Sequence, residues 1–451
     1  MFVFRLFSKK YVALFLITIF FFELTLSFKI FAQIEPIIQS DSAIVMDSKT
    51  GAILYGKNIH RKQYPASITK IMTALLAIEK GNPDDIITFS DNAVYSIDWG
   101  SSHIGMREGE QITLNDALYG MLLMSANEVS NAIAEHIDGS VENFADSMNE
   151  KAKELGAYNT HFVNPHGLHD PDHYTTAYDM ALITREALKY DKFREVAGTL
   201  TYVIPPTNLV NEPRYLAHQH RLYNNKAYPN SYYEGCEGGK TGYTNEARHT
   251  LVTFAKREDL ELIVVVLKSE KQEMYEDTKR LLDYGFENFE PSILIEAGAS
   301  AGKVTLGQNE GLKEEKSVEV YAEKTLETVL PKELTEDIKQ EITLSNKLSF
   351  PIYEGDVIGS LNYIYKNEII ASVNVLSAEN VEGNDSILES LSQNDIKKKS
   401  ASITDNKVIR LSIMSVLTIL ILVLFFLTIN LINRLRQKRR YWDLFKDYNK
   451  R

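Results

Sequence analysis

The sequence predicts an α+β protein, in which an antiparallel sheet carries helices on both faces and a helical insertion between its strands. A small all-β domain and a C-terminal transmembrane helix are expected to follow. Strand-like runs stand at both ends of residues 33–285, and helical segments fill the interval between them. Short, partly alternating runs occupy 286–378, and one long uncharged apolar run comes near the C-terminus.

Four runs of the first segment have the composition of strands. Residues 42–47 and 52–55 flank a polar turn that contains Gly51, which predicts a hairpin. Residues 249–255 and 260–267 are β-rich and are joined by a charged turn. The two pairs lie at opposite ends of the segment. If they form a single antiparallel sheet, the helices between them are an insertion into that sheet.

Three helices are expected between these pairs. The first covers 67–80 and is stopped by Gly81. The second begins after Thr113, a favourable N-cap residue, and covers 114–124. The third covers about 127–137. These segments form the predicted helical insertion.

Residues 286–378 are predicted to form the small β-domain with hairpins. Its strand-like runs are 318–321, 342–344, 357–365 and 369–376. Residues 379–407 are rich in Ser, Asn, Asp and Lys and have few apolar side chains. This composition is typical of a flexible tether.

Two terminal segments predict the compartment. Residues 1–32 resemble a secretory signal peptide, with basic residues before an apolar run at 11–22 and a cut expected after Ala32. A transmembrane helix is predicted at 408–433, because 411–432 carry no charge and would measure about 33 Å as a helix. The basic tail 434–451 is expected in the cytoplasm. We therefore expect a cell-membrane protein whose catalytic domain lies on the extracytoplasmic side.

Composition excludes other classes of function. The net charge is −12 and the soluble part has no dominant basic stretch, which argues against nucleic acid as a partner. The one cysteine, Cys236, has no adjacent histidine and cannot form an intrachain disulfide. We therefore assign it a structural or incidental role.

A serine and a lysine three residues apart, Ser67 and Lys70, open the predicted helix 67–80. This spacing places both side chains on one helical face, beside the free N–H groups of a helix N-terminus. Ser67 would be the nucleophile, and a neutral Lys70 would accept its proton. A similar pair, Ser300 and Lys303, lies among glycines near a predicted strand, where no helix aligns it.

A second pair, Ser125 and Asn127, stands at the junction of two predicted helices. Such a junction can project a hydroxyl and an amide into a cleft from a rigid support. The tripeptide 90–92, Ser-Asp-Asn, directly follows a strand-like run and is interpreted as a helix cap instead.

A third motif, Lys240-Thr241-Gly242, precedes the two late strands and can therefore lie on a sheet edge. Gly242 would allow close backbone approach, and the lysine and threonine could bind a substrate carboxylate. The same three residue types at 49–51 fall in the first hairpin turn, where a solvated turn is the better interpretation.

Three histidines and two aspartates occur within residues 166–173 and could in principle hold a zinc ion. Prolines and a glycine in and beside this stretch would break any helix that presented them together. We therefore expect a surface or cleft-rim loop, and we predict no metal and no cofactor.

The ordered motifs, together with residues 65–73, 164–168, 173–177 and 239–244, resemble the low-molecular-mass penicillin-binding proteins. These proteins are serine-type D-alanyl-D-alanine carboxypeptidases. The resemblance covers roughly residues 35–378 and implies a penicillin-binding/β-lactamase-like fold. It also implies peptidoglycan stem peptides as substrates and β-lactams as covalent ligands.

The family pattern implies a role for each motif residue. Ser67 would attack the carbonyl between the two terminal D-alanines, with Lys70 as its base, and Ser125 would pass a proton to the departing D-alanine. The implied substrate-binding residues are Asn127, Lys240, Thr241, Gly242 and Tyr243. Lys240 would also share in the proton relay, and the N–H groups of Ser67 and Tyr243 would form the oxyanion hole.

Some residues depart from the common pattern and leave the substrate preference open. They are Glu128 after the second motif, Arg248 and His249 after the third, and the segment 218–221. A D,D-endopeptidase of peptidoglycan is the alternative within the same chemistry, and a β-lactamase would need an added Glu-bound water. A non-enzymatic wall-binding scaffold is the alternative from another class.

Overall fold

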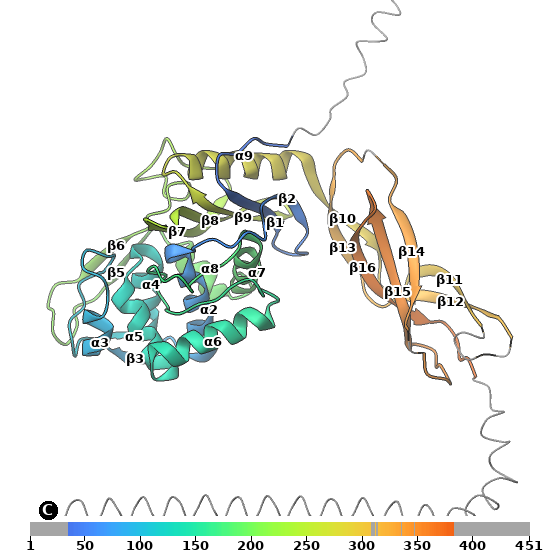
Figure 1. Cartoon of the computed structure of the whole chain (residues 1–451), viewed down its shortest axis with the longest axis horizontal. Coiled ribbons are helices and arrows are strands. Elements are labelled where there is room, and N and C mark those ends of the chain that lie inside the picture. The colour runs from blue at the N-terminus through green and yellow to red at the C-terminus, as the bar shows by residue number, and fades with distance from the viewer. Residues whose placement is uncertain (1–34, 308–311, 313, 335, 347, 383–451) are drawn as a thin grey trace, which may run out of the picture. The chain divides into compact units, whose positions relative to one another are not determined.

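One sheet of five antiparallel strands, in the order β2-β1-β9-β8-β7, organises the N-terminal region, which we define as residues 35–288 (Figure 1). The computed structural model describes residues 35–382 except 308–311, 313, 335 and 347. The strands are β1 (Ser42–Asp47), β2 (Ile53–Lys57), β7 (Cys236–Thr244), β8 (Arg248–Arg257) and β9 (Leu260–Ser269). The predicted hairpin and both late strands are confirmed.

Both faces of this sheet are covered, which explains why its central strands are continuous apolar runs. Along β1, Ile44 and Met46 belong to one hydrophobic core, whereas Ala43 and Val45 belong to another. Strand β9 alternates in the same way. Because successive side chains of a strand point to opposite faces, the two cores must lie on opposite sides of the sheet.

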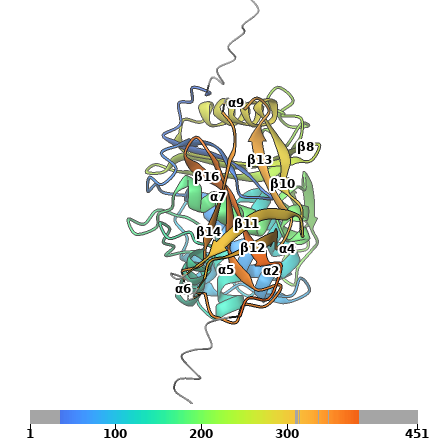
Figure 2. The same ribbon diagram turned by 90° about the vertical axis from the view of Figure 1, so that its right-hand side faces the viewer.

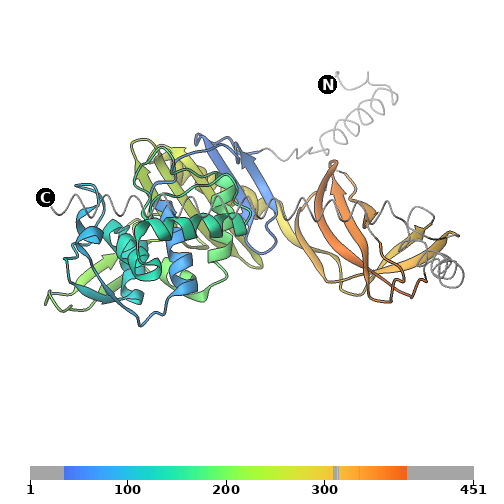
Figure 3. The same ribbon diagram turned by 60° about the horizontal axis from the view of Figure 1, so that its bottom comes forward.

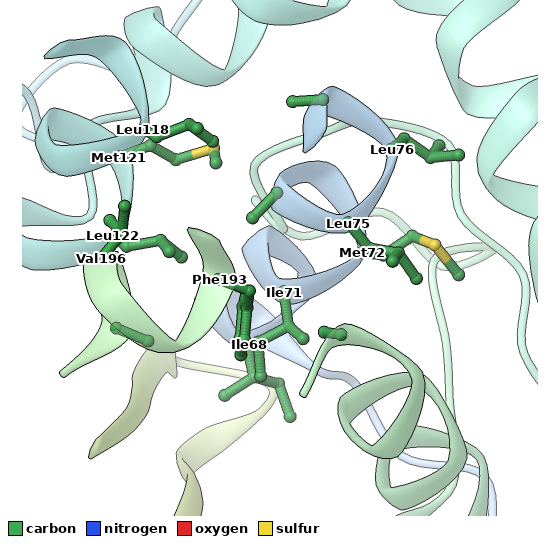
Figure 4. Close-up of a cluster of buried hydrophobic side chains, with 14 of the residues drawn as sticks. Ile68, Ile71, Met72, Leu75, Leu76, Leu118, Met121, Leu122, Phe193 and Val196 are labelled. Atoms are coloured by element: carbon green, nitrogen blue, oxygen red, sulfur yellow. The ribbon is translucent and has the colours of Figure 1, made fainter. Parts of the chain in front are cut away.

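Helices cover both faces, as predicted. Helix α9 (Glu273–Asn288) packs on one face, and the remaining helices lie on the other (Figures 1 and 2). This second group contains α2 (Lys70–Lys80), α4 (Leu114–Met124), α5 (Asn127–Asp138), α6 (Val141–Glu154), α7 (Ala177–Ala187) and α8 (Asp191–Ala197). Figure 3 presents the group from another side. Side chains of α2, α4 and α8 gather in its core (Figure 4).

Two of the predicted helices carry the local signals that the sequence indicated. The Thr113 hydroxyl caps α4 by accepting a hydrogen bond from the Asp116 N–H at 3.0 Å. The predicted helix 67–80 is divided instead, because a 3₁₀ turn, η1 (Ala66–Thr69), precedes α2. Gly81 follows α2 as expected.

Smaller elements complete the N-terminal region. Helix α3 (Asp91–Tyr95) is short, strand β3 (Ile86–Thr88) pairs with β4 (Gln111–Thr113), and β5 (Thr201–Ile204) pairs with β6 (Arg214–Ala217). The Ser90 hydroxyl accepts a hydrogen bond from the Ala93 N–H, so the 90–92 tripeptide does cap a helix. Residues 49–51 lie in the β1–β2 turn, as expected.

The C-terminal region, which we define as residues 289–382, is built of strands. Strand β10 (Phe289–Ile295) pairs with β13 (Leu326–Pro331). A second sheet has the order β11-β12-β16-β15-β14. Its strands are β11 (Ser300–Leu306), β12 (Lys316–Ala322), β14 (Lys339–Leu344), β15 (Val357–Tyr365) and β16 (Glu368–Ser377). The four predicted runs lie within strands of this sheet, and Ser300 and Lys303 lie in β11.

The predicted signal peptide, transmembrane helix and basic tail lie outside the described residues, as does most of the predicted tether. Within the described part of the chain, no helix combines the length and apolar character needed to cross a bilayer.

Candidate active site

Ser67 lies in η1, and two threonine hydroxyls bind the carbonyl groups of the two residues before it. Ala66 has a φ of +52°, a conformation that costs energy for a residue with a Cβ. The Thr250 hydroxyl of β8 donates to the Pro65 carbonyl at 2.8 Å, and the Thr69 hydroxyl donates to the Ala66 carbonyl at 2.8 Å. These bonds fix the backbone from which Ser67 projects.

A buried histidine supports the same turn. His173 Nδ1 accepts a hydrogen bond from the Val163 N–H at 3.1 Å, so the ring proton belongs on Nε2. Nε2 lies 2.9 Å from the Thr69 hydroxyl, which is itself committed as donor to Ala66. Burial lowers the pKa of His173 to about 3, so the ring is a neutral donor at physiological pH.

The Lys70 amine is fully buried and has three oxygen neighbours. Its Nζ lies 3.2 Å from Ser67 Oγ, 2.7 Å from Asn127 Oδ1 and 2.7 Å from the His166 carbonyl oxygen. A neutral amine has two N–H donors and one lone pair. The two short contacts to oxygens without protons use the donors, which leaves the lone pair for the Ser67 hydroxyl.

The surroundings of Lys70 favour this neutral form. Burial lowers its pKa well below the ordinary value, and the nearby positive charge of Lys240 lowers it further. The Glu128 carboxylate acts in the opposite direction and raises the pKa. The geometry and the electrostatics therefore agree that Lys70 can accept the proton of Ser67.

Ser125 and Lys240 form a second hydrogen-bonded pair. Ser125 ends α4 in the left-handed conformation with a φ of +62°, where glycine or asparagine is usual. Lys240 Nζ in β7 donates to Ser125 Oγ at 3.0 Å and to the Thr241 carbonyl at 2.9 Å. Burial lowers the pKa of Lys240 to about 7, so this lysine can give or take a proton near neutral pH.

The edge strand β7 approaches Ser67 so closely that only glycine fits at 242. A Cβ on Gly242 would lie 2.8 Å from the Ser67 nitrogen and 2.4 Å from Thr250 Oγ1. This approach brings the β7 backbone beside the Ser67 N–H. Next to it, the half-exposed Tyr243 ring lies 4.6 Å from the His249 ring.

A cleft of about 520 Å³ connects these groups. Six of the eight predicted site residues line it: Ser67, Ser125, Asn127, Thr241, Gly242 and Tyr243. The remaining two, Lys70 and Lys240, are buried and reach the cleft through the hydroxyls of Ser67 and Ser125, to which they are hydrogen-bonded. The three distant motifs therefore meet at one place.

The cleft also contains residues that sequence reasoning did not assign. Arg221 places its guanidinium 5.4 Å from the Tyr228 ring centre and 5.3 Å from the Tyr275 ring centre. Lys271 lines the same wall, so the cleft favours anionic groups. The departure of segment 218–221 from the common pattern was the one available signal for Arg221, and no sequence pattern indicated its aromatic neighbours.

The histidine-rich stretch forms a loop at the cleft, as predicted, because its Leu168 lines the cleft. His169 is exposed, whereas His166 and His173 are buried. The reason is that the loop packs against α2, with the Pro165 carbonyl accepting from the Thr73 hydroxyl at 2.6 Å. In the described part of the chain, no group of His, Cys, Asp and Glu side chains is arranged to hold a metal ion. Cys236 is buried, and burial raises its pKa to about 12.

Sequence comparison identifies relatives of both regions. The family profile described as D-alanyl-D-alanine carboxypeptidase matches residues 29–271, and the profile of the penicillin-binding protein 5 C-terminal domain matches residues 289–383. D-alanyl-D-alanine carboxypeptidase DacF of Bacillus subtilis is 33% identical over 76% of this chain and 86% of its own length. DacC of Escherichia coli is 29% identical over 77% and 85%.

Solved structures of related proteins are also similar to this chain. Penicillin-binding protein 5 from Haemophilus influenzae has a TM-score of 0.63 and 28% identity, and the match covers 77% of this chain and 99% of that one. The carboxypeptidase DacD from Francisella tularensis has a TM-score of 0.60 and 26% identity, with coverages of 80% and 98%.

Proposed function

The chain belongs to the D-alanyl-D-alanine carboxypeptidase family, and on that premise we propose that it removes the terminal D-alanine from peptidoglycan stem pentapeptides through an acyl-enzyme at Ser67. One observation carries the proposal. The Ser67 hydroxyl lies 3.2 Å from a buried amine whose two other contacts leave its lone pair facing that hydroxyl.

In the acylation step, Ser67 Oγ forms a bond to the carbonyl carbon between the two D-alanines while its proton passes to Lys70. The developing oxyanion is stabilised by the backbone N–H groups of Ser67 and Tyr243. The close approach of β7 at Gly242 supports this assignment, because it sets the two backbone segments side by side.

Collapse of the intermediate breaks the C–N bond, and the leaving amine takes a proton from the Ser125 hydroxyl. Lys240 replaces that proton across the 3.0 Å hydrogen bond. Asn127 holds the substrate amide and Thr241 binds the terminal carboxylate. Water then attacks the ester and passes a proton through Ser125 to Lys240, while Lys70 returns its proton to Ser67 Oγ as the ester C–O bond breaks. The shortened peptide is released and the starting protonation states are restored.

A β-lactam offers Ser67 a strained amide in the same position, so penicillin would acylate the same oxygen. The sequence patterns at 1–32 and 408–433 support an exported protein held in the cell membrane by one C-terminal helix. The catalytic region would then face the peptidoglycan.

The test is release of D-alanine from a pentapeptide that ends in D-Ala-D-Ala. We expect release by the wild-type protein and none by Ser67→Ala, together with labelled penicillin attached to Ser67 in the wild type only. If the protein left pentapeptides intact but cleaved peptidoglycan cross-bridges, it would be an endopeptidase rather than a carboxypeptidase. Absence of both cleavage and penicillin attachment would favour a wall-binding scaffold.

A further inference from the structure

An exposed tryptophan stands beside the cleft without a structural explanation. Trp99 has a relative exposure of 101%, although tryptophan is among the side chains that folding buries most on average. No aromatic or cation contact is recorded for its ring among the described residues. Its indole therefore does not pack in the hydrophobic core.

The backbone around Trp99 forms a tight turn that presents the ring to solvent. The Ser101 N–H donates to the Asp98 carbonyl at 3.0 Å, and Gly100 between them has a φ of +79°. This is the pattern of a type II turn, with Trp99 at the second position. Proline is common at that position, and the turn itself does not call for a large aromatic ring.

The turn is anchored to the catalytic helix α5. The Asn127 N–H donates to the Ser102 carbonyl at 2.9 Å, and Glu128 Oε1 accepts from the Ile104 N–H at 2.7 Å. The three residues that follow Trp99, namely Gly100, Ser101 and Ser102, line the cleft. The backbone of Trp99 is therefore held directly beside residues that line the cleft.

A second observation at this turn also points to a ligand. The Ser101 hydroxyl lies in the cleft wall and has no hydrogen-bond partner among the described residues. An inaccessible hydroxyl without a partner costs free energy unless something binds to it. The neighbours Asp98, Ser102 and His103 are exposed and polar.

We propose that Trp99 and the polar groups of its turn bind a sugar ring of the glycan strand that carries the stem peptide. This inference rests on the proposed function, because it takes the peptide to lie in the cleft. A pyranose ring has an apolar C–H face and a hydroxyl-bearing edge. It can stack on an indole while its edge contacts the exposed side chains of Asp98, Ser102 and His103.

The surroundings favour a sugar over a membrane or a protein. A protein hot spot or a lipid-inserting residue would be expected within a wider apolar patch. Trp99 has the exposed Tyr95 and the partly exposed Ile97 before it in the sequence, but its other exposed neighbours, Asp98, Gly100, Ser102 and His103, are small or polar. The carboxylates of Asp91 and Asp98 disfavour anionic lipid headgroups.

The first experiment compares two substrates that share one peptide. One is the free pentapeptide, and the other is the same pentapeptide linked to a disaccharide of N-acetylated amino sugars. Trp99→Ala should lower kcat/KM for the disaccharide-linked substrate about fivefold to tenfold, mainly through KM, and leave the free peptide unchanged. Trp99→Phe should restore most of the loss. Tyr158→Ala, at another exposed aromatic that does not line the cleft, should change kcat/KM for neither substrate.

The second experiment uses fluorescence, because the chain has two tryptophans, Trp99 and Trp442. In a full-length Trp442→Phe protein, Trp99 is the single tryptophan. Its emission should move to shorter wavelength with the disaccharide-linked peptide, and should not move with the free peptide or with anionic lipid vesicles.

The outcomes separate this inference from the proposed function. Three results would overturn the sugar site and leave the peptidase function unaffected. They are an equal loss of kcat/KM on both substrates in Trp99→Ala, a Trp99 emission that does not change with the disaccharide-linked peptide, and an emission that changes only with vesicles. An emission shift with the disaccharide in a protein that cleaves neither substrate would support the sugar site and refute the peptidase.

Discussion

The N-terminal and C-terminal regions differ in where they place strained backbone and buried charge. Among the described residues of the C-terminal region, the non-glycine residues with positive φ are Lys366 and Asn367, which form the two-residue turn between β15 and β16. The N-terminal region also has positive φ at such turns, for example at Glu258 between β8 and β9, but in addition at Ala66 beside the nucleophile and at Ser125 at the end of α4. Hairpin geometry explains the turn residues, whereas the strain at Ala66 and Ser125 lies at the candidate site.

Buried polar groups show the same contrast. Among the described residues after 288, the buried polar side chains are the uncharged Thr328, Asn362 and Ser377. The N-terminal region buries carboxylates that do not line the cleft, such as Glu110 and Asp179, but both lysines that it buries among the described residues, Lys70 and Lys240, contact hydroxyls of the cleft. A fold tolerates buried charge where hydrogen bonds satisfy it, so two buried amines beside one cleft mark the chemistry.

The largest effect should come from removing the buried amine. Lys70→Met should slow acylation by labelled penicillin at least about a thousandfold, because Ser67 loses its base. Thermal unfolding should change little or shift upward, because an apolar side chain of similar length replaces a desolvated amine. Lys366→Met in the C-terminal region is the matched control and should alter neither measurement. If the Lys70→Met protein were both slow in acylation and unfolded, the slow acylation could not be assigned to the lost base. The contrast between the two regions would then fail.

Steric crowding of two glycines offers a sharper comparison. A Cβ on Gly242 would meet the Ser67 nitrogen at 2.8 Å, and a Cβ on Gly359 would meet the Thr343 carbonyl oxygen at 2.5 Å. Gly242→Ala should lower kcat/KM about a hundredfold, since it displaces the nucleophile. Gly359→Ala should lower the free energy of unfolding by about 1–3 kcal/mol with kcat/KM unchanged. Steady-state kinetics would measure kcat/KM of both variants, and denaturant unfolding would measure their free energies of unfolding. Equal losses of kcat/KM in the two variants would count against the assignment of Gly242 to the active site.

The histidine loop provides a pair within one segment. His173→Ala removes the donor to Thr69 and should lower the acylation rate about tenfold to thirtyfold, because the turn before Ser67 loses its support. His169→Ala, at an exposed position four residues earlier, should behave as wild type. A His173→Ala protein with full acylation rate would make this histidine a packing residue only.

The smallest effect concerns pH. The pKa of Lys240 is about 7, so its ammonium form, which the proposed relay uses, is lost as pH rises through that value. Turnover should therefore fall by less than tenfold between pH 6.5 and 7.5. Lys240→Arg keeps the charge at all these pH values and should show a lower rate without this alkaline fall. A wild-type profile that stayed flat to pH 9 would exclude Lys240 as the titrating group.

Sequence patterns predicted the local features well where short-range chemistry decides them. The Thr113 cap, the stop at Gly81 and the hairpin around Gly51 each depend on residues within a few positions. The position of Ser125 between two predicted helices also favoured it over Ser90, which follows a strand-like run, and the structure puts Ser125 in the cleft and Ser90 at a helix cap. The loop at 166–173 was predicted as a surface or cleft-rim loop, but the burial of His166 and His173 within it was not, because that burial depends on packing against α2.

By itself, the sequence determined which side chains are available: a serine and a lysine one helical turn apart, a second serine between two helices, and a glycine where an edge strand must come close. Only the tertiary structure decided their states. Lys70 loses its charge because distant segments bury it and occupy its two donors, and Ser125 meets Lys240 because β7 pairs at the sheet edge. Desolvation and long-range pairing are properties of the folded chain, and no window of sequence contains them.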